Sequence, residues 1–150
     1  MTVDKIVTQK EQLEIVGATL LSLEEAETLP LRLRKHTNWW WLRSPGYYAH
    51  FVAFISGTGS VNYHGTNVYY KDGAVRIALK IKNLKSSNLK IGDRFIFGNK
   101  TFEIISENRA FCLEDIGEQR FRKDDANDYA QSDIKKFIDE WFKNANKENE

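Results

Sequence analysis

The sequence is poor in cysteine and proline, and it has no excess of charge of either sign. Of its 150 residues one is cysteine, Cys112, and two are proline, Pro30 and Pro45. A single cysteine excludes a disulfide framework within the chain and indicates a reducing compartment. The formal net charge of +1 gives no drive toward nucleic acid or toward an anionic membrane surface.

Long apolar stretches are absent as well. No run approaches the roughly 20 apolar residues that a membrane-spanning helix needs. The first residues, MTVDK, lack the basic start and the apolar stretch of a secretory signal. The sequence therefore predicts a soluble protein of the cytoplasm, or of a phage particle, without a membrane partner.

Two helices are predicted from local patterns. Ser22 and Glu25 have the spacing of a capping box, which predicts a helix start, and Pro30 predicts an early end. A longer helix is predicted from about Ser132 to about Asn144. Its apolar stripe at helical spacing consists of Ile134, Phe137, Ile138, Trp141 and Phe142.

The remaining patterns predict strands. Val75 to Lys82 alternates apolar and polar residues with a period of two, and Trp39 to Trp41 is typical of a half-buried strand that Pro45 and Gly46 end. Further strands are predicted at 48–55, 94–97, 101–105 and 110–113, and irregular structure with short strands at 61–70. The expected fold is α+β, with mixed, mainly antiparallel sheets and two helices. It forms a single domain over residues 1–150 with a frayed tail at 146–150.

A motif around the tryptophans resembles a known family. Trp40 to Gly46, reading WWLRSPG, is similar to a segment of an uncharacterised family of bacterial and phage domains of unknown function, DUF6273. The segments at 20–26 (LLSLEEA) and 74–79 (AVRIAL) are similar to that family's helix start and to its GVRPAL strand. Ile77 replaces the family's proline and Ala74 its glycine. The resemblance implies a C-type-lectin-like fold, related to formylglycine-generating enzymes.

The order of the similar segments differs from that of the family. Residues 1–82 resemble its C-terminal half, whereas 89–145 resemble its N-terminal half, so we interpret the chain as circularly permuted. The polar linker 83–88 predicts that the strands before and after it are neighbours, most simply in an antiparallel hairpin. An exchange of halves in a domain-swapped homodimer stays open as an alternative.

Several residues are expected to have structural roles. Arg43 and Arg76 lie in otherwise apolar strands, where a guanidinium needs carbonyl or carboxylate partners. Core positions are predicted for Trp40, Trp41 and Trp141. Neither the even spacing of His36, His50 and His64 nor the acidic group Asp124, Asp125 and Asp128 has the pattern of a metal site, so no metal or other cofactor is predicted.

The strongest candidate surface lies between residues 47 and 70, which are rich in Tyr, Asn and Gly. This mixture is typical of antibody paratopes. The predicted binding residues are Tyr47, Tyr48, Tyr63, His64, Asn67, Tyr69 and Tyr70. Since no catalytic motif is found, we expect a non-catalytic binding module for a protein or a glycan. The alternatives are a small phage-encoded protein inhibitor of a host defence system and an enzyme of unrecognised type.

Overall fold

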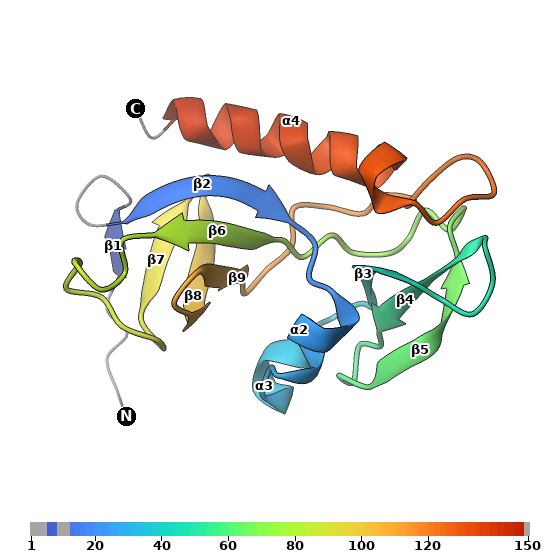
Figure 1. The fold of residues 1–150 in the computed structure, drawn as a ribbon, viewed down its shortest axis with the longest axis horizontal. Coiled ribbons are helices and arrows are strands. Elements are labelled where there is room, and N and C mark those ends of the chain that lie inside the picture. Colours follow the sequence, from blue (N-terminus) through green and yellow to red (C-terminus); the bar gives the residue numbers. More distant parts are fainter. Residues whose placement is uncertain (1–5, 9–12, 149–150) are drawn as a thin grey trace.

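The structure, a computed structural model, describes residues 6–8 and 13–148, which form two sheets and three α-helices (Figure 1). The six-stranded sheet contains β1 (Ile6–Thr8), β2 (Glu14–Thr19), β6 (Ala78–Lys82), β7 (Arg94–Phe97), β8 (Lys100–Ser106) and β9 (Arg109–Cys112). The three-stranded sheet contains β3 (Trp40–Pro45), β4 (Phe51–Ile55) and β5 (Val61–Asn67). The helices are α2 (Leu23–Glu27), α3 (Leu31–Arg34) and α4 (Asp133–Glu148), with a 3₁₀ turn, η1 (Tyr129–Gln131), before α4. The predicted α+β class with mainly antiparallel sheets is confirmed.

The larger sheet has the order β1-β7-β8-β9-β6-β2 and is strongly curled. Among the strands of this sheet that the structure describes, β1 and β7 alone pair in parallel. Strands β1 and β2 form opposite edges, yet only the five residues 9–13 connect them. Because each residue extends the chain by at most about 3.6 Å, the two edges must approach each other. Figure 1 shows β1 beside the start of β2.

The predicted hairpin of β6 and β7 is wrong. Strands β8 and β9 lie between them in the sheet, so β6 pairs with β9 and β2 instead. Neighbouring strands are about 4.8 Å apart, so the connection has to cover about 14 Å. The eleven residues 83–93 can span roughly 35 Å. A short linker therefore does not demand adjacency, and the physical support for a permuted order is lost.

The expectation of two helices also needs correction, because Pro30 does more than end α2. It is the N-cap of α3, and its carbonyl accepts hydrogen bonds from the N–H groups of Leu33 and Arg34. Proline suits this position because its own missing N–H would have no partner there. The capping box of α2 is confirmed, with Ser22 and Glu25 each bonding the other's backbone N–H. Helix α4 continues beyond the expected end near Asn144, to Glu148.

Two strand predictions differ from the structure. The segment 61–70, expected to be irregular, contains one seven-residue strand, β5, whose polar side chains suit the edge of a sheet. In the alternating segment 75–82, pairing with neighbouring strands begins only at Ala78. The residues before Ala78 are buried on both faces of the chain. The second face is covered by α2, α3 and the smaller sheet, which is why Arg76 is buried as well.

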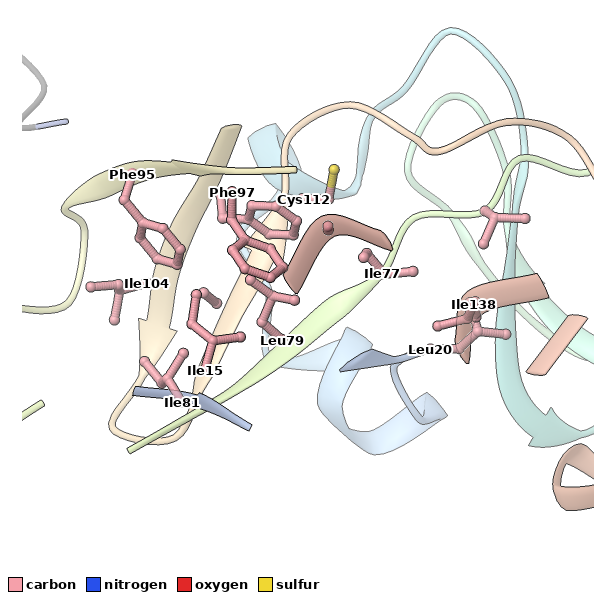
Figure 2. Close-up of a cluster of buried hydrophobic side chains, with 14 of the residues drawn as sticks. Ile15, Leu20, Ile77, Leu79, Ile81, Phe95, Phe97, Ile104, Cys112 and Ile138 are labelled. Carbon is pink, nitrogen blue, oxygen red and sulfur yellow. The ribbon is translucent and has the colours of Figure 1, made fainter. Parts of the chain in front are cut away.

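Two apolar clusters hold these layers together. The larger lies between one face of the six-stranded sheet and α4 (Figure 2), and it includes Leu79, Phe97 and Ile138. The second joins α2 and α3 to the smaller sheet through Trp40, and it reaches Phe111 of β9. Trp39 and Trp41 pack edge to face at 4.7 Å, whereas Trp40 packs against Phe111 at 5.4 Å. The tryptophans therefore alternate between the two sides, as expected for a strand.

Candidate functional site

An exposed group of rings lies where the β3–β4 turn meets β5. We call Tyr47, Tyr48, His50, Phe51 and His64 the aromatic cluster. The ring of Tyr47 stacks on that of His64 with 5.1 Å between centroids, and Tyr48 stacks on His50 at 5.9 Å. Phe51 contacts both groups edge to face, with its ring 5.2 Å from that of Tyr48 and 5.4 Å from that of His64.

The backbone of the β3–β4 turn brings these rings together. The N–H of Gly46 donates to the carbonyl of Phe51, and the N–H of Tyr47 donates to the carbonyl of His64 at 2.8 Å. A side chain at Gly46 would place its Cβ 2.4 Å from the His64 carbonyl oxygen, so only glycine permits this approach. Asn127 supports the turn from another loop, since its Nδ2 donates to the carbonyls of Tyr48 and Phe51.

The cluster leaves large ring surfaces in water. Tyr47 is 77% exposed and Tyr48 is 53% exposed. A buried tyrosine adds stability to a fold, but a ring exposed to this extent adds little, and its apolar area stays available for a partner. The exposed cluster is therefore the best candidate contact surface on the described residues.

The other predicted binding residues lie elsewhere. Tyr63 precedes His64 in β5 and points to the opposite side, where the negative charge of Glu27 raises its pKa. The Asn67 side chain accepts a hydrogen bond from the N–H of Tyr69, whose hydroxyl donates to Asp125. Tyr70 is exposed and has no ring contact within the part of the chain that the structure describes. Sequence analysis missed His50, Phe51 and Asn127.

Arg76 is enclosed by the core. Its guanidinium lies between the rings of Trp40, at 4.9 Å, and Phe111, at 4.5 Å. It donates to three backbone carbonyls, those of Leu33, Cys112 and Glu114. Burial lowers its pKa to about 10, so the group keeps its charge at neutral pH.

The indole N–H groups of two buried tryptophans also bond to carbonyls. Trp40 donates to Arg34 at 2.9 Å and Trp41 to Gln119 at 2.8 Å. Trp141, on α4, packs against Phe97 at 6.0 Å. Trp40 and Trp41 are therefore fully buried in the core, whereas Trp141 is partly buried and packs against it.

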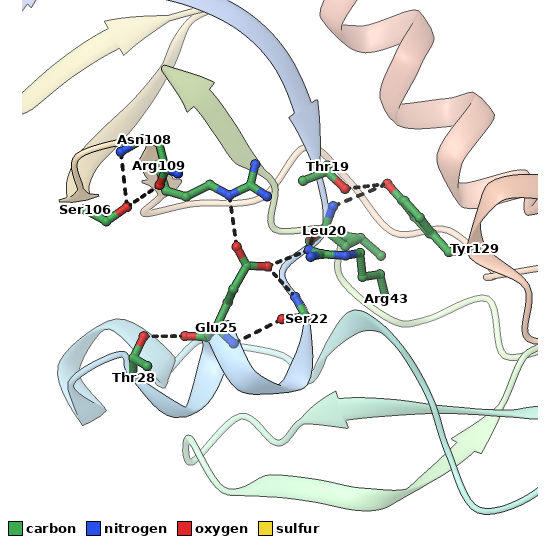
Figure 3. Close-up of polar contacts among 10 residues, drawn as sticks. All are labelled: Thr19, Leu20, Ser22, Glu25, Thr28, Arg43, Ser106, Asn108, Arg109 and Tyr129. Carbon is green, nitrogen blue, oxygen red and sulfur yellow. Dashed lines mark hydrogen bonds and ion pairs between the residues drawn. The ribbon is translucent and has the colours of Figure 1, made fainter. Parts of the chain in front are cut away.

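Glu25 is the centre of a polar network (Figure 3). Its carboxylate accepts hydrogen bonds from the Ser22 N–H, from Arg43 Nη1 at 2.6 Å and from Arg109 Nε at 2.9 Å. Burial alone would raise the pKa of Glu25, but the bonds from Ser22 and Arg43 and the charge of Arg109 lower it to about 2. Arg43 thus has the carboxylate partner that its position demands.

We expect Glu25→Gln to lower the free energy of unfolding at neutral pH by about 1–2 kcal/mol, allowing for solvent screening of this partly exposed group. Because the folded pKa lies below the ordinary value of 4.5, the contribution of Glu25 is complete above that value and is lost as the pH falls toward 2. Urea unfolding followed from neutral pH to about pH 2.5 measures this, and the variant should show the flatter profile. Glu24→Gln, in the same helical turn but exposed, is the control. Equal losses in both variants would mean that only the helix dipole matters.

Residues of the types that commonly take part in catalysis are either buried or paired with another charged side chain in this structure. Burial raises the pKa of the Cys112 thiol to about 12, which removes the thiolate that a nucleophilic cysteine needs. His36 Nε2 lies 2.7 Å from Asp115 Oδ2, and Asp124 pairs with Arg122. Among residues 6–8 and 13–148, no three His, Cys, Asp or Glu side chains gather closely enough to hold a metal ion.

No protein-family model, curated protein or solved structure matches the chain. Within the described ranges, no helix has both the length and the apolar character that crossing a membrane requires.

Proposed function

We propose that this chain is a non-catalytic binding module that contacts a protein partner through the aromatic cluster. The observation that carries the proposal is the exposure of stacked tyrosine and histidine rings on a turn that backbone hydrogen bonds and Asn127 hold in place. Preformed rings lose little conformational entropy on binding, and tyrosines are enriched among the residues that dominate interface energies.

A protein is favoured over a glycan by the polar groups next to the rings. A sugar needs side-chain donors and acceptors beside the stacking ring to bond its hydroxyl groups. Here the amide oxygen of Asn62 accepts from Gly65 N–H, and the amide nitrogen of Asn127 is used by two carbonyls. The amides beside the rings are thus occupied, and what remains is ring surface with phenol and imidazole groups at its rim, the combination that tyrosine-rich protein interfaces use.

Affinity capture from a lysate of the organism that encodes the chain tests this proposal. We expect the native chain to retain one stoichiometric protein and Tyr47→Ala/Tyr48→Ala to lose it, with at least about a thirtyfold weaker affinity once the partner is purified. The thermal midpoint of the double variant should stay near that of the native chain, since both rings are exposed.

The matched control is Tyr63→Ala. Tyr63 is 57% exposed, like Tyr48, but it lies on the other side of β5. Its loss should leave capture unchanged. Equal capture by all three proteins would contradict the proposal, and so would saturable binding to a glycan array that depends on Tyr47.

The resemblance to the DUF6273 family belongs to this proposal as well. It implies a C-type-lectin-like fold with its halves in permuted order, and it rests on the WWLRSPG motif and the two shorter similar segments. A binding module with an exposed loop surface is consistent with that kinship, whereas fold kinship alone does not determine activity.

A further inference from the structure

A second surface feature is a cavity of about 350 Å³ beside edge strand β2, formed by other residues than the aromatic cluster. Its wall includes residues 16–19, and its other side chains come from β3, β6, β9, η1 and α4. Those side chains are Arg43, Lys80, Arg109, Tyr129, Lys135 and Asp139. Its volume is in the range of sites for small molecules.

The cavity has an excess of positive charge. Four basic side chains line it, and two carboxylates lie close enough to compensate them. Glu25 bonds both Arg43 and Arg109, and Asp139 bonds Lys135 at 2.7 Å. Lys80 has no carboxylate within ion-pair distance in the part of the chain that the structure describes, and its side chain lies across Gly17. Two positive charges are therefore left for an anion.

Two hydrogen-bond donors at this cavity lack an acceptor. Nη1 of Arg109 is buried and has no hydrogen-bond partner among the described residues. The Tyr129 hydroxyl oxygen accepts from Thr19 Oγ1 and from Leu20 N–H, both at 3.3 Å, so its own proton is free to donate. The Tyr129 hydroxyl can therefore donate to an anion in the cavity, whereas Nη1 of Arg109, which solvent does not reach, adds positive charge but no direct contact.

We propose that this cavity binds a small molecule through a phosphoryl group. A tetrahedral dianion matches the excess of two charges, and guanidinium and ammonium groups together are the usual phosphate ligands in proteins. A nucleic acid is not favoured, because the chain has a net charge of +1 and the acidic side chain of Asp139 lines the same cavity. A carboxylate ligand shares part of this chemistry and is an outcome of the test.

Titration of the full chain with inorganic phosphate and pyrophosphate at constant ionic strength, followed by amide NMR shifts, tests the site. We expect saturable shifts at Gly17, Thr19 and Tyr129. Lys80→Ala should weaken binding about tenfold, the usual effect of losing one charge-assisted contact. Lys80 is exposed, so this variant should fold normally.

The matched control is Lys136→Ala, which removes the same charge from α4 next to Lys135 but outside the cavity lining. It should change the dissociation constant by less than about twofold. Shifts that do not saturate, or equal weakening by both variants, would overturn the proposal. Citrate binding as tightly as pyrophosphate would overturn the phosphoryl assignment in favour of a carboxylate. None of these outcomes depends on the aromatic cluster.

Discussion

Replacing Arg76 by methionine is expected to lower the free energy of unfolding by about 3–5 kcal/mol. The methionine side chain fills most of the space between Trp40 and Phe111, so little volume is lost. The three carbonyl oxygens that Arg76 bonds would then be left in the core without a donor, at a cost of about 1–3 kcal/mol for each that water cannot reach. Urea unfolding at neutral pH measures the difference.

The variant Arg76→Lys distinguishes the contribution of the positive charge from that of the guanidinium's shape and donor arrangement. A lysine ammonium has the same charge, but it cannot present three donors to carbonyls on different segments or stack between two rings. We expect it to recover less than half of the loss. Lys80→Met, four residues along the chain but exposed, should change stability by less than about 0.5 kcal/mol. A loss below about 1 kcal/mol in Arg76→Met would mean that water replaces the guanidinium.

Local patterns predicted local structure well. The start of α2 follows from Ser22 and Glu25, whose side chains need only each other's backbone. The alternation of Trp39, Trp40 and Trp41 follows from the pleat of a strand, whatever the strand pairs with. These features depend on neighbours in the sequence, so the sequence contains what is needed to recognise them.

The sequence patterns could not predict which strands pair with each other. The segments on either side of residues 83–93 are adjacent along the chain, but β8 and β9 occupy the positions between them. Tight turns join β7 to β8 and β8 to β9, and these hairpins form whether or not β6 lies next to β7. The burial of Arg76 could not be predicted for the same reason, because it depends on α3 and the smaller sheet, which are distant in sequence.

The candidate site was predicted in part. The wrong assignment of Tyr63 to it contradicts the simple alternation of side chains along a strand. Tyr47, Tyr48 and His64 come together, but only because the β3–β4 turn lies against β5, which no local pattern indicates. Tyr63 and His64 are consecutive, and in a strand they must face opposite sides. An irregular segment, which the composition of residues 61–70 predicts, would not impose this alternation, and the predicted surface therefore includes Tyr63, which lies on the other side of β5.

The docking of α4 on the large sheet gives the second prediction of large effect, at Gly98 in the β7–β8 turn. An added Cβ there would lie 2.7 Å from the Cβ of Ala145 and 2.8 Å from Cζ2 of Trp141. Both atoms belong to a long helix packed on the sheet, so neither is free to move alone. We expect Gly98→Ala to lower the free energy of unfolding by about 2–4 kcal/mol, measured by urea unfolding.

Gly92→Ala distinguishes this steric cost from backbone strain. Gly92 has a φ of +99°, farther from the region that alanine tolerates than the +57° of Gly98, but an added Cβ at Gly92 meets no atom within 4 Å. Backbone strain alone would therefore make Gly92→Ala the more harmful change. If α4 packs as described, the order is reversed and Gly98→Ala costs more. The opposite order would show that α4 can yield at Trp141 and Ala145, and that its contact with the β7–β8 turn contributes little to the stability of the fold.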